Sequence, residues 1–584
     1  MIQVEKLTYG FPAKDLYKDI SFTLESGRHC ALIGSNGTGK STLADMLIDP
    51  DKYLYDGKII RDEGCRIGYA GQFTVRDKAQ DMTVFQYLSE KFLKNQQAIT
   101  DVCEEMAVAE SVDELFEKYQ QLLDIHEAMD GDNYESNIRK ELYLAGMSDL
   151  EETGISLVSG GEYKMLQIMR EMLVSPDLLI LDGPDVFLDF GNLGGLCQLI
   201  NSYKGTLLAI THNRYLLDHC FDKILDLENC DIQEYDGNYS EYHCTQLQEK
   251  LKLKRQNLAE REEIRRTEEM VERLRDRATL MVNPTIGRSV NAKQSQLDSL
   301  LARHIKAPFV QIREPEIKLP VVEPQGAGPV LTIEDYEVAF DKSLLENVSF
   351  QLLAGEKVAI VGANGTGKTT LLRDILSNEH PAVHIADDVR CACLSQLQGE
   401  NMDEDKTVYE LMEDAGLGTK KDIRTFLSGY CIEEDCLDRR LSQLSGGEQN
   451  LLQIAMLAVS DAQLLILDEP TSQLDIYAQT ALEKALAEYR GTVIMVSHDF
   501  YLVSGCADYV LFVEDNTIRR MGAKKFRRLV YGSYFEQSYL AVDRRKQELE
   551  KDINQAFKKN DLAAAEKLCA ELASLALPTQ EAGE

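Results

Sequence analysis

One stretch occurs twice in the chain and restricts its fold more than any other feature. The copies are Gly34-Ser35-Asn36-Gly37-Thr38-Gly39-Lys40-Ser41-Thr42 and Gly362-Ala363-Asn364-Gly365-Thr366-Gly367-Lys368-Thr369-Thr370. Each fits G-x-x-x-x-G-K-[ST], follows an apolar run typical of a buried strand and precedes a helical pattern. In such a loop, backbone N–H groups surround phosphate oxygens and the lysine reaches the outer phosphates. Two copies in this context predict two nucleotide sites rather than two glycine-rich turns.

Further motifs follow each loop in the same order. The loop residues Ser41 and Thr369 offer hydroxyls to Mg²⁺. A glutamine at a strand end reaches Mg²⁺ and the attacking water, and a Ser-Gly-Gly turn at a helix N-terminus is a second anion site. The matched pairs are Gln72 and Gln396, the turns Ser159-Gly160-Gly161-Glu162 and Ser445-Gly446-Gly447-Glu448, the strand-end residues Asp182 and Asp468, and His212 and His498.

The spacing of these pairs indicates an internal duplication. Ser159 to Ser445, Asp182 to Asp468 and His212 to His498 are each 286 residues, whereas the two loops are 328 apart. The spacing between matched motifs changes because the first half carries about 37 extra residues after its glutamine. Apolar residues recur there at three- and four-residue steps, which predicts a protruding helical pair over about 92–131, either a decoration or a partner-binding arm.

Composition excludes several classes of protein. No run of 18 apolar residues exists, so no membrane span is expected, and the start lacks the pattern of a signal peptide. The 13 cysteines are scattered without a CxxC pair, which favours reduced structural thiols in the cytoplasm. A net charge of −35 argues against nucleic-acid binding over the whole surface.

The segment between the repeats differs in charge from the rest of the chain. Residues 243–320 hold 16 Lys and Arg against 11 Asp and Glu, and they read as two long helices broken at Asn283-Pro284-Thr285-Ile286-Gly287. The second helix is expected from about Arg288. A basic antiparallel stalk on an acidic body suits local contact with RNA, although a solvated charged coiled coil has the same pattern.

The motifs, in this order and twice, resemble those of ATP-binding-cassette ATPases, over roughly residues 1–240 and 329–535. The resemblance implies an α/β fold with two P-loop cassettes facing head to tail, one ATP with Mg²⁺ lying between each loop and the opposite Ser-Gly-Gly turn. Site one would combine Lys40, Ser41, Gln72, Asp182 and His212 with Ser445-Gly446-Gly447. Site two would combine Lys368, Thr369, Gln396, Asp468 and His498 with Ser159-Gly160-Gly161. Adenine would stack on Phe11 and Phe340, although both also suit a core and Tyr9 competes with Phe11.

The two copies differ at the position that activates water in this family. The second reads Asp468-Glu469-Pro470, with Glu469 in that place, and its implied catalytic residues are Glu469, His498 and Gln396. The first reads Asp182-Gly183-Pro184-Asp185, and Gly183 has no side chain to polarise water. Unless Asp185 replaces it, site one binds ATP and hydrolyses it slowly, while site two turns over.

The linker and its flank Asp236-Gly237-Asn238-Tyr239-Ser240 resemble the F subfamily, tandem cassettes that mostly act on ribosomes. This resemblance implies a monomer with a first cassette over 1–240, a linker over 241–328 and a second cassette over 329–538. Residues 539–584 read as charged helix with a loose apolar stripe, which favours a packing extension over a separate binding module. It also implies ribosomal RNA and tRNA contacts near the exit and P sites through Arg273, Arg275, Arg277, Arg288, Lys293 and the tip. General translation control and antibiotic protection both remain open. The alternatives are the ATPase subunit of an importer and an ATP-gated scaffold.

Overall fold

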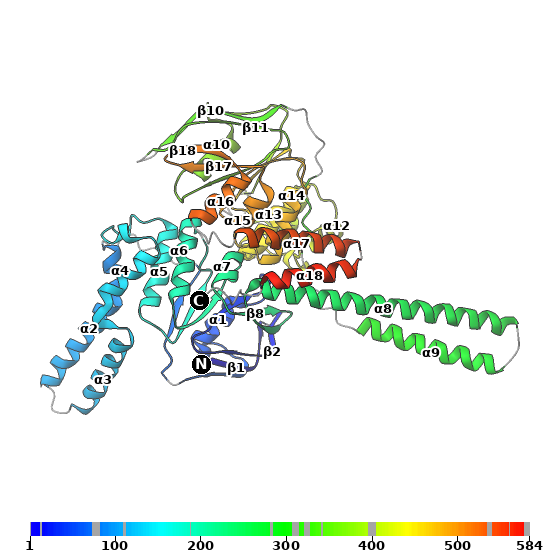
Figure 1. Cartoon of the computed structure of the whole chain (residues 1–584), viewed down its shortest axis with the longest axis horizontal. Helices are drawn as coiled ribbons and strands as arrows, with labels where there is room; N and C mark the ends of the chain where they lie inside the picture. Colours follow the sequence, from blue (N-terminus) through cyan, green and yellow to red (C-terminus); the bar gives the residue numbers. More distant parts are fainter. Residues whose placement is uncertain are drawn as a thin grey trace. The chain divides into compact units, whose positions relative to one another are not determined.

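The computed structural model confirms the predicted α/β class with two cassettes and an antiparallel helical linker. It describes residues 2–11, 14–62, 64–72, 82–108, 112–186, 188–280, 284–306, 315–320, 328–339, 343–394, 405–533, 540–559 and 561–576. The chain forms two compact units, unit 1 (Met1–Asp236 and Arg313–Gln537) and unit 2 (Gly237–Ile312 and Ser538–Glu584). Unit 1 holds cassette 1, before residue 237, and cassette 2, after residue 312 (Figure 1).

Each cassette is built on a six-stranded sheet in which only the last strand is antiparallel to its neighbour. In cassette 1 the order is β5 (Ile67–Ala70), β6 (Leu178–Asp182), β7 (Thr206–Ile210), β3 (His29–Ile33), β8 (Lys223–Glu228) and β9 (Asp231–Asp236). In cassette 2 it is β14 (Cys391–Leu394), β15 (Leu464–Asp468), β16 (Thr492–Val496), β12 (Lys357–Gly362), β17 (Tyr509–Glu514) and β18 (Thr517–Gly522). The identical order shows that the sequence duplication is a duplication of structure.

A three-stranded antiparallel sheet accompanies each large sheet. Its strands are β2 (Lys14–Leu24), β1 (Ile2–Phe11) and β4 (Asp56–Arg61) in cassette 1, and β11 (Ser343–Leu353), β10 (Pro329–Ala339) and β13 (Val383–Ile385) in cassette 2. Each small sheet packs with its large sheet into one hydrophobic core.

The central parallel strands are mostly apolar, as expected for strands that are covered on both faces. Strands β6 and β15 share the sequence Leu-Leu-Ile-Leu-Asp, and all five residues of each are buried. Their last residues, Asp182 and Asp468, pair in register with Ile210 and Val496. The carboxyl ends of neighbouring strands therefore meet at one edge, where the motif residues gather.

Helices pack around the sheets, and several of them carry a motif at the N-terminus. In cassette 1 these are α1 (Lys40–Ile48), α5 (Gly160–Leu173), α6 (Phe190–Ser202) and α7 (Arg214–His219). In cassette 2 they are α10 (Lys368–Ser377), α11 (Val408–Asp414), α12 (Lys420–Ser428), α13 (Gly446–Val459), α14 (Ile476–Glu488), α15 (Phe500–Cys506) and α16 (Ala523–Ser533).

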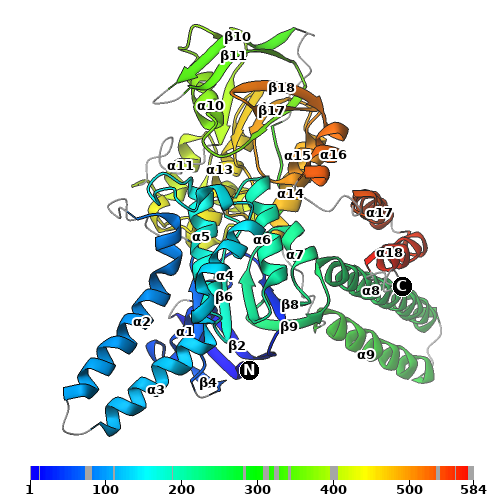
Figure 2. The ribbon, with the colours of Figure 1, turned by 60° about the vertical axis from the view of Figure 1, so that its left-hand side comes forward.

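The extra residues of cassette 1 form a helical arm, which Figure 2 shows as two helices running side by side. Helix α2 (Val84–Val108) and helix α3 (Asp113–Ala128) are followed by α4 (Tyr134–Leu144). The Asn95 side chain is buried and donates a hydrogen bond from Nδ2 to the Leu122 carbonyl, 3.3 Å away, which joins α2 to α3.

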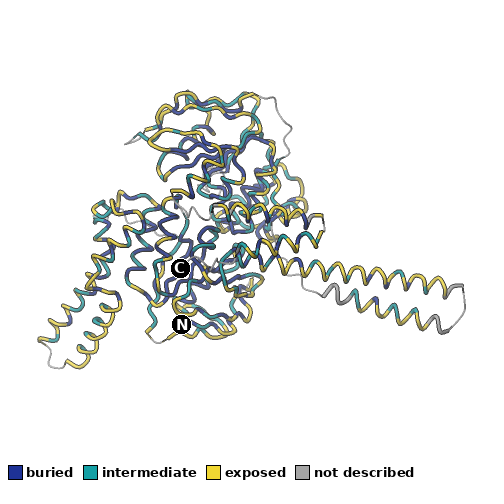
Figure 3. Tube along the Cα trace, viewed as in Figure 1, coloured by how far each residue is buried: buried dark blue, intermediate teal, exposed yellow. Residues whose placement is uncertain are grey.

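Unit 2 contains the stalk, formed by α8 (Tyr239–Leu280) and α9 (Pro284–Lys306). Helix α9 begins at Pro284 and includes Gly287, so the expected start near Arg288 is wrong. Proline suits the first helical position because it has no N–H to leave unpaired there. Exposed residues predominate along both helices in Figure 3, and the buried contacts between them include Ile264, Val271 and Leu297.

The C-terminal helices α17 (Leu540–Lys558) and α18 (Leu562–Ala576) pack against each other, and α18 packs on the first turns of α8. Their common core includes Leu247, Leu549 and Phe557. At its edge Lys546 Nζ donates to Ser240 Oγ at 2.6 Å, and Arg255 pairs with Glu566. Among the described residues, the chain has no helix with the length and apolar character needed to cross a bilayer.

Candidate nucleotide sites

The two repeated loops fold in the same way at the edge of their sheets. Each runs from β3 or β12 into α1 or α10, and the residue before each helix, Gly39 or Gly367, is left-handed with φ of 96° or 89°. Glycine adopts this conformation without steric cost. No side chain caps either helix, so the first-turn N–H groups remain available to an anion.

The loop lysines close each loop on itself. Lys40 Nζ donates to the carbonyls of Gly34 and Ser35 at 2.8 Å each, and Lys368 Nζ donates to those of Gly362 and Ala363 at 2.9 and 2.7 Å. Both side chains are buried, and burial lowers the pKa of Lys40 to about 8 and also lowers that of Lys368. An added anion would favour the charged form of each lysine.

The first loop lies against cassette 2. The backbone N–H of Asn36 donates to Asp475 Oδ2 at 2.9 Å, and its Nδ2 donates to the Gln473 carbonyl at 2.8 Å. A Cβ at Gly447 would collide with Asn36 Nδ2, so glycine is required there for the Ser445-Gly446-Gly447 turn to approach the loop. Both Ser-Gly-Gly turns are capping boxes, in which Ser159 and Ser445 cap their own helices.

The second loop makes the reciprocal contact with cassette 1. The N–H of Asn364 donates to Asp189 Oδ2 at 3.3 Å, and Phe190 packs edge-on against the His498 ring with centroids 5.9 Å apart. Asp189 and Asp475 cap α6 and α14, the helices that follow the Asp-ended strands. Each loop thus faces the capping residue of the opposite cassette. The cassettes meet head to tail.

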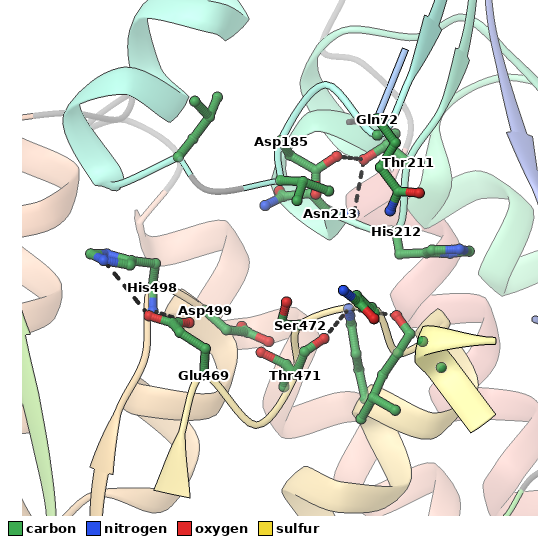
Figure 4. A pocket seen from close by; sticks show the side chains of 18 of the residues that line it. Gln72, Asp185, Thr211, His212, Asn213, Glu469, Thr471, Ser472, His498 and Asp499 are labelled. Atoms are coloured by element: carbon green, nitrogen blue, oxygen red, sulfur yellow. Dashed lines mark hydrogen bonds and ion pairs between the residues drawn. The ribbon is translucent and has the colours of Figure 1, made fainter. Parts of the chain in front are cut away.

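Both loops and both Ser-Gly-Gly turns border one cavity of about 950 Å³ between the cassettes. Figure 4 shows Asp185 and His212 of cassette 1 on one wall, with Glu469 and His498 of cassette 2 on the other. The sequence-predicted residues that line it are Asn36, Gly37, Gly39, Lys40, Ser41, Thr42, Gln72, Gly160, Gly161, Asp182, His212, Asn364, Gly365, Gly367, Lys368, Thr369, Thr370, Ser445, Gly446, Gly447, Asp468, Glu469 and His498. The structure therefore brings most of the candidate residues together.

Glu469 and His498 form a titratable pair in the cavity, and burial shifts the pKa of each. The backbone N–H of His498 donates to Glu469 Oε2 at 3.2 Å, and its Nε2 lies 3.7 Å from Glu469 Oε1. Burial, with the charge of Asp468 adding to it, raises the pKa of Glu469 to about 8. Burial lowers the pKa of His498 to about 3, so its ring is neutral near pH 7.

The turn of cassette 1 that matches the Glu469 turn has, among the described residues, no carboxylate at the position of Glu469. Gly183 N donates to the Ile210 carbonyl at 2.9 Å, as Glu469 N does to that of Val496, so the backbones match. Asp185 lines the cavity two residues later, but its Oδ1 accepts a hydrogen bond of 2.6 Å from Thr211 Oγ1. Burial raises the pKa of Asp185. This carboxyl is oriented by Thr211 rather than by His212.

The residues fit ATP with Mg²⁺. Uncapped helix N-termini and buried lysines suit a polyphosphate, and the ring nitrogens of His498 have no hydrogen-bond partner among the described residues, which leaves them available to a ligand. Ser41 lies beside Asp182, and Thr369 Oγ1 lies 3.5 Å from Asp468 Oδ1. Hydroxyl and carboxylate oxygens are the hard donors that Mg²⁺ prefers.

The predicted adenine-stacking residues and the second glutamine are not brought into the cavity by the part of the chain that the structure describes. Phe11 is 54% exposed, packs edge-on against Tyr9 and is not among the residues lining the cavity. Phe340 and Gln396 fall outside the described residues. Adenine stacking and a glutamine in the second site stay predictions.

Three contributors were missed by sequence reasoning. Asp189 and Asp475 hold the opposite loops, and their spacing of 286 residues would have identified them as another matched pair. Glu228, at the end of β8, accepts hydrogen bonds from the N–H and, at 2.6 Å, the hydroxyl of Ser35. The same spacing pairs Glu228 with Glu514, but the contact of Glu228 with the loop depends on the pairing of β3 with β8.

The predicted RNA-contacting residues lie on the outer part of the stalk. Arg273, Arg275, Arg277 and Arg288 are exposed, and Lys293 is half-buried. Arg273 pairs with Glu269 at 3.3 Å, and Arg275 donates to Gln294 Oε1 on α9 at 2.9 Å. Such exposed contacts stabilise the fold by at most about 1 kcal/mol each. They therefore do not prevent these side chains from binding phosphates instead.

Comparison with known families decides the class of the protein. Two family models, both described as ABC transporter, match residues 17–186 with 345–472 and residues 225–319. The chain belongs to the ATP-binding cassette family. The cassettes of this ABC protein are thus ATPase domains, and its relatives include one named as an F family member.

Two relatives match nearly the whole ABC protein. The "Energy-dependent translational throttle protein EttA" of Haemophilus influenzae is 28% identical over 521 residues, covering 86% of this chain and 89% of the relative. The "ABC transporter F family member 5" of Arabidopsis thaliana is 29% identical over 592 residues, covering 97% and 81%. A solved archaeal ribosome recycling factor, aABCE1, has the same fold, with a TM-score of 0.55, 19% identity and coverage of 91% and 92%.

Proposed function

We propose that this protein is an F-subfamily ATPase that acts on the ribosome in the cytoplasm and has two unequal sites. The observation that carries the ATPase proposal is the shared cavity, where the loop of each cassette meets the other cassette. The ribosomal part is supported by the name of EttA, a translational throttle, and by the exposed basic residues of the stalk.

In site two, the chain's own residues hold and polarise the reactants. When bound, ATP with Mg²⁺ supplies the reacting phosphoryl group and the metal charge that neutralises it. The second loop and Lys368 hold the phosphates, while Ser159-Gly160-Gly161 of cassette 1 closes over them. Glu469, once ionised, accepts a proton from the attacking water at its carboxylate. Neutral His498, beside Glu469, orients the water and outer phosphate oxygens.

Site one binds ATP and turns it over slowly. Its loop and lysine match those of site two, so phosphate binding is retained. Its turn carries Gly183 in place of Glu469, and Asp185 is engaged by Thr211. Site one thus holds the cassettes together while site two controls their release.

The stalk is the part of the chain that contacts the ribosome. By analogy with the F subfamily, α8 and α9 enter the tRNA exit site, and their tip approaches the P-site tRNA. There the protein modulates translation or displaces antibiotics, while closure of the cassettes on ATP controls how long the stalk stays. Binding would be local and salt-dependent because the surrounding body is acidic.

Trapping with Glu469→Gln tests the proposal. The variant should bind ATP, fail to release it, and sediment with ribosomes in an ATP-dependent way, whereas Lys40→Ala combined with Lys368→Ala should not sediment. A map of the trapped complex then shows which tRNA site the stalk occupies and whether an antibiotic there is displaced. Absence of co-sedimentation, together with capture of a membrane subunit, would replace this proposal by the importer alternative.

A further inference from the structure

Lys164 is a buried cation in cassette 1 that sequence motifs do not assign. It lies on α5, in the turn that follows the Ser-Gly-Gly motif, and is only 4% exposed. Its Nζ donates to the Gly71 carbonyl at 2.5 Å and lies 3.5 Å from that of Gln72. Because burying an ammonium costs several kcal/mol unless it is compensated, these carbonyls and nearby carboxylates must offset a large penalty.

Cassette 2 has a different residue at the equivalent position. Asn450, 286 residues later, donates from Nδ2 to the carbonyls of Pro470 and Ser472 at 3.3 and 2.6 Å. It holds the segment after Glu469. Lys164 instead holds the end of the strand that carries Gln72, so the two helices anchor different parts of their sites.

Lys164 thereby fixes Gln72 over Gly183. A Cβ on Gly183 would lie 3.1 Å from Gln72 Cγ, and the backbone at Gly183 matches that at Glu469. Gln72 and Val186, whose Cγ2 would also lie 3.1 Å from that Cβ, therefore crowd the position into which a side chain at 183 would project.

The two sites also differ in charge. The charges of Asp182 and Asp185 both act on Lys164, whereas in cassette 2 Lys368 is the lysine that faces Asp468 and Glu469. In addition, Asn213 stands in cassette 1 where cassette 2 has Asp499, whose charge acts on Glu469. Cassette 1 therefore has Lys164 where cassette 2 has the neutral Asn450, and the neutral Asn213 where cassette 2 has Asp499, so a polyphosphate in site one needs less compensation from a divalent cation.

We infer that Lys164 is a positioning residue that adapts site one to retain a nucleoside triphosphate without the divalent cation that site two requires. It does so by holding Gln72 in place and by placing an ammonium group beside Asp182 and Asp185. The inference rests on the proposed division between a holding site and a hydrolysing site. It explains how site one can keep its nucleotide for longer than site two.

Nucleotide retention in the full chain, without ribosomes, tests this role. Protein loaded with radiolabelled ATP and Mg²⁺ is moved into excess EDTA, and bound nucleotide is followed by rapid filtration. The wild type should lose the nucleotide of one site and keep that of the other, and Lys40→Ala, but not Lys368→Ala, should abolish the retained fraction. Lys164→Met, which keeps the length of the stem, should release the retained nucleotide on the order of tenfold faster, as expected when one charge-assisted hydrogen bond is removed.

Two further variants separate a positioning role from general destabilisation. Lys164→Arg keeps the charge and should restore retention. Lys223→Met removes another buried lysine of cassette 1, whose Nζ donates to the Thr23 carbonyl at 3.2 Å away from the cavity, and should leave retention unchanged. Equal release from both wild-type sites in EDTA, or full retention by Lys164→Met, would overturn the inference. Failure of ribosome binding would overturn only the ribosomal proposal, because retention is measured without ribosomes.

Discussion

Gly183 and Glu469 hold the same left-handed backbone conformation, with φ of 58° and 48°, in two copies of one turn. A non-glycine residue in this region costs roughly 1 kcal/mol, and strain of this kind persists where the surrounding structure and function require it. The buried carboxyl of Glu469 adds a desolvation cost to that strain. Cassette 1 has neither cost, which agrees with a turn that no longer activates water.

Replacing Glu469 by glutamine should remove hydrolysis while preserving ATP binding. Loss of a positioned base typically lowers kcat by about 10²–10⁴-fold, and the amide keeps the size of the side chain. Phosphate release under saturating ATP measures the effect, and the exposed Glu433→Gln in the same cassette is the control. Hydrolysis by Glu469→Gln at more than about a tenth of the wild-type rate would show that the base lies elsewhere.

The raised pKa of Glu469 predicts how hydrolysis depends on pH. A carboxyl with a pKa of about 8 is mostly protonated at pH 7, and only its ionised form accepts a proton. At low ATP, hydrolysis should therefore rise up to about tenfold per pH unit below pH 8 and level off above it. Nucleotide affinity measured over the same range is the control, and a flat or falling rate at constant affinity would contradict the assignment.

At the scale of elements, the C-terminal pair completes the root of the stalk. Helix α8 alone has a polar sequence, and its apolar residues near the root, such as Leu247 and Leu251, are covered by α17 and α18. Helix packing of this kind supplies most of the stability of a helix in water.

Phe557→Ala should loosen this root. Truncating a buried phenylalanine costs about 3–5 kcal/mol, and Phe557 is 8% exposed with Lys254 Nζ 4.6 Å from its ring centroid. Amide hydrogen exchange at 244–251 should accelerate on the order of a hundredfold where local opening controls it. Leu253→Ala, at a position 46% exposed on the same helix, should change exchange little, and equal effects of both variants would refute the packing role.

Sequence patterns predicted the parts of this fold that depend on local chemistry. The phosphate loops and the Asp-ended strands follow from glycine spacing and apolar runs, whereas the two cassettes were implied by a family resemblance. The helix start at Pro284 was misjudged because proline both ends a helix and favours a first helical position. The roles of Glu228 and Lys164 depend on which carbonyl or hydroxyl a long-range fold brings near them, and no local pattern records that.

At the scale of the whole molecule, an ion pair joins the two cassettes beside the cavity. Arg214 of cassette 1 pairs with Glu483 of cassette 2, and its guanidinium lies 4.2 Å from the ring centroid of Tyr501. The Arg214 and Glu483 side chains are only 14% and 18% exposed, so the ion pair is largely shielded from water when the cassettes are together. Opening would expose both to water.

Arg214→Met should weaken closure of the cassettes. Removing one partner of a largely buried pair costs about 3–5 kcal/mol, whereas replacing both by apolar residues is often nearly neutral. Nucleotide-dependent compaction, followed by small-angle scattering, should therefore require more ATP in Arg214→Met and recover in the double variant with Glu483→Met. Lack of recovery would mean that Arg214 acts through Tyr501 rather than through the ion pair.

Separate parts of the chain should control ATP turnover and ribosome binding. Arg273, Arg275 and Arg277 lie in unit 2, whereas the nucleotide cavity lies in unit 1, so their replacement by glutamine should leave ribosome-free hydrolysis unchanged. Each arginine–phosphate interaction that is removed should reduce the slope of log affinity against log salt by about 0.7–0.9, so sedimentation of the triple variant with ribosomes should weaken and depend less on salt. The matched control is Arg265→Gln with Arg266→Gln, nearer the root of the same helix, where each arginine already pairs with a glutamate four residues away. If the control weakens binding as much as the triple variant, total charge rather than the outer stalk determines the interaction.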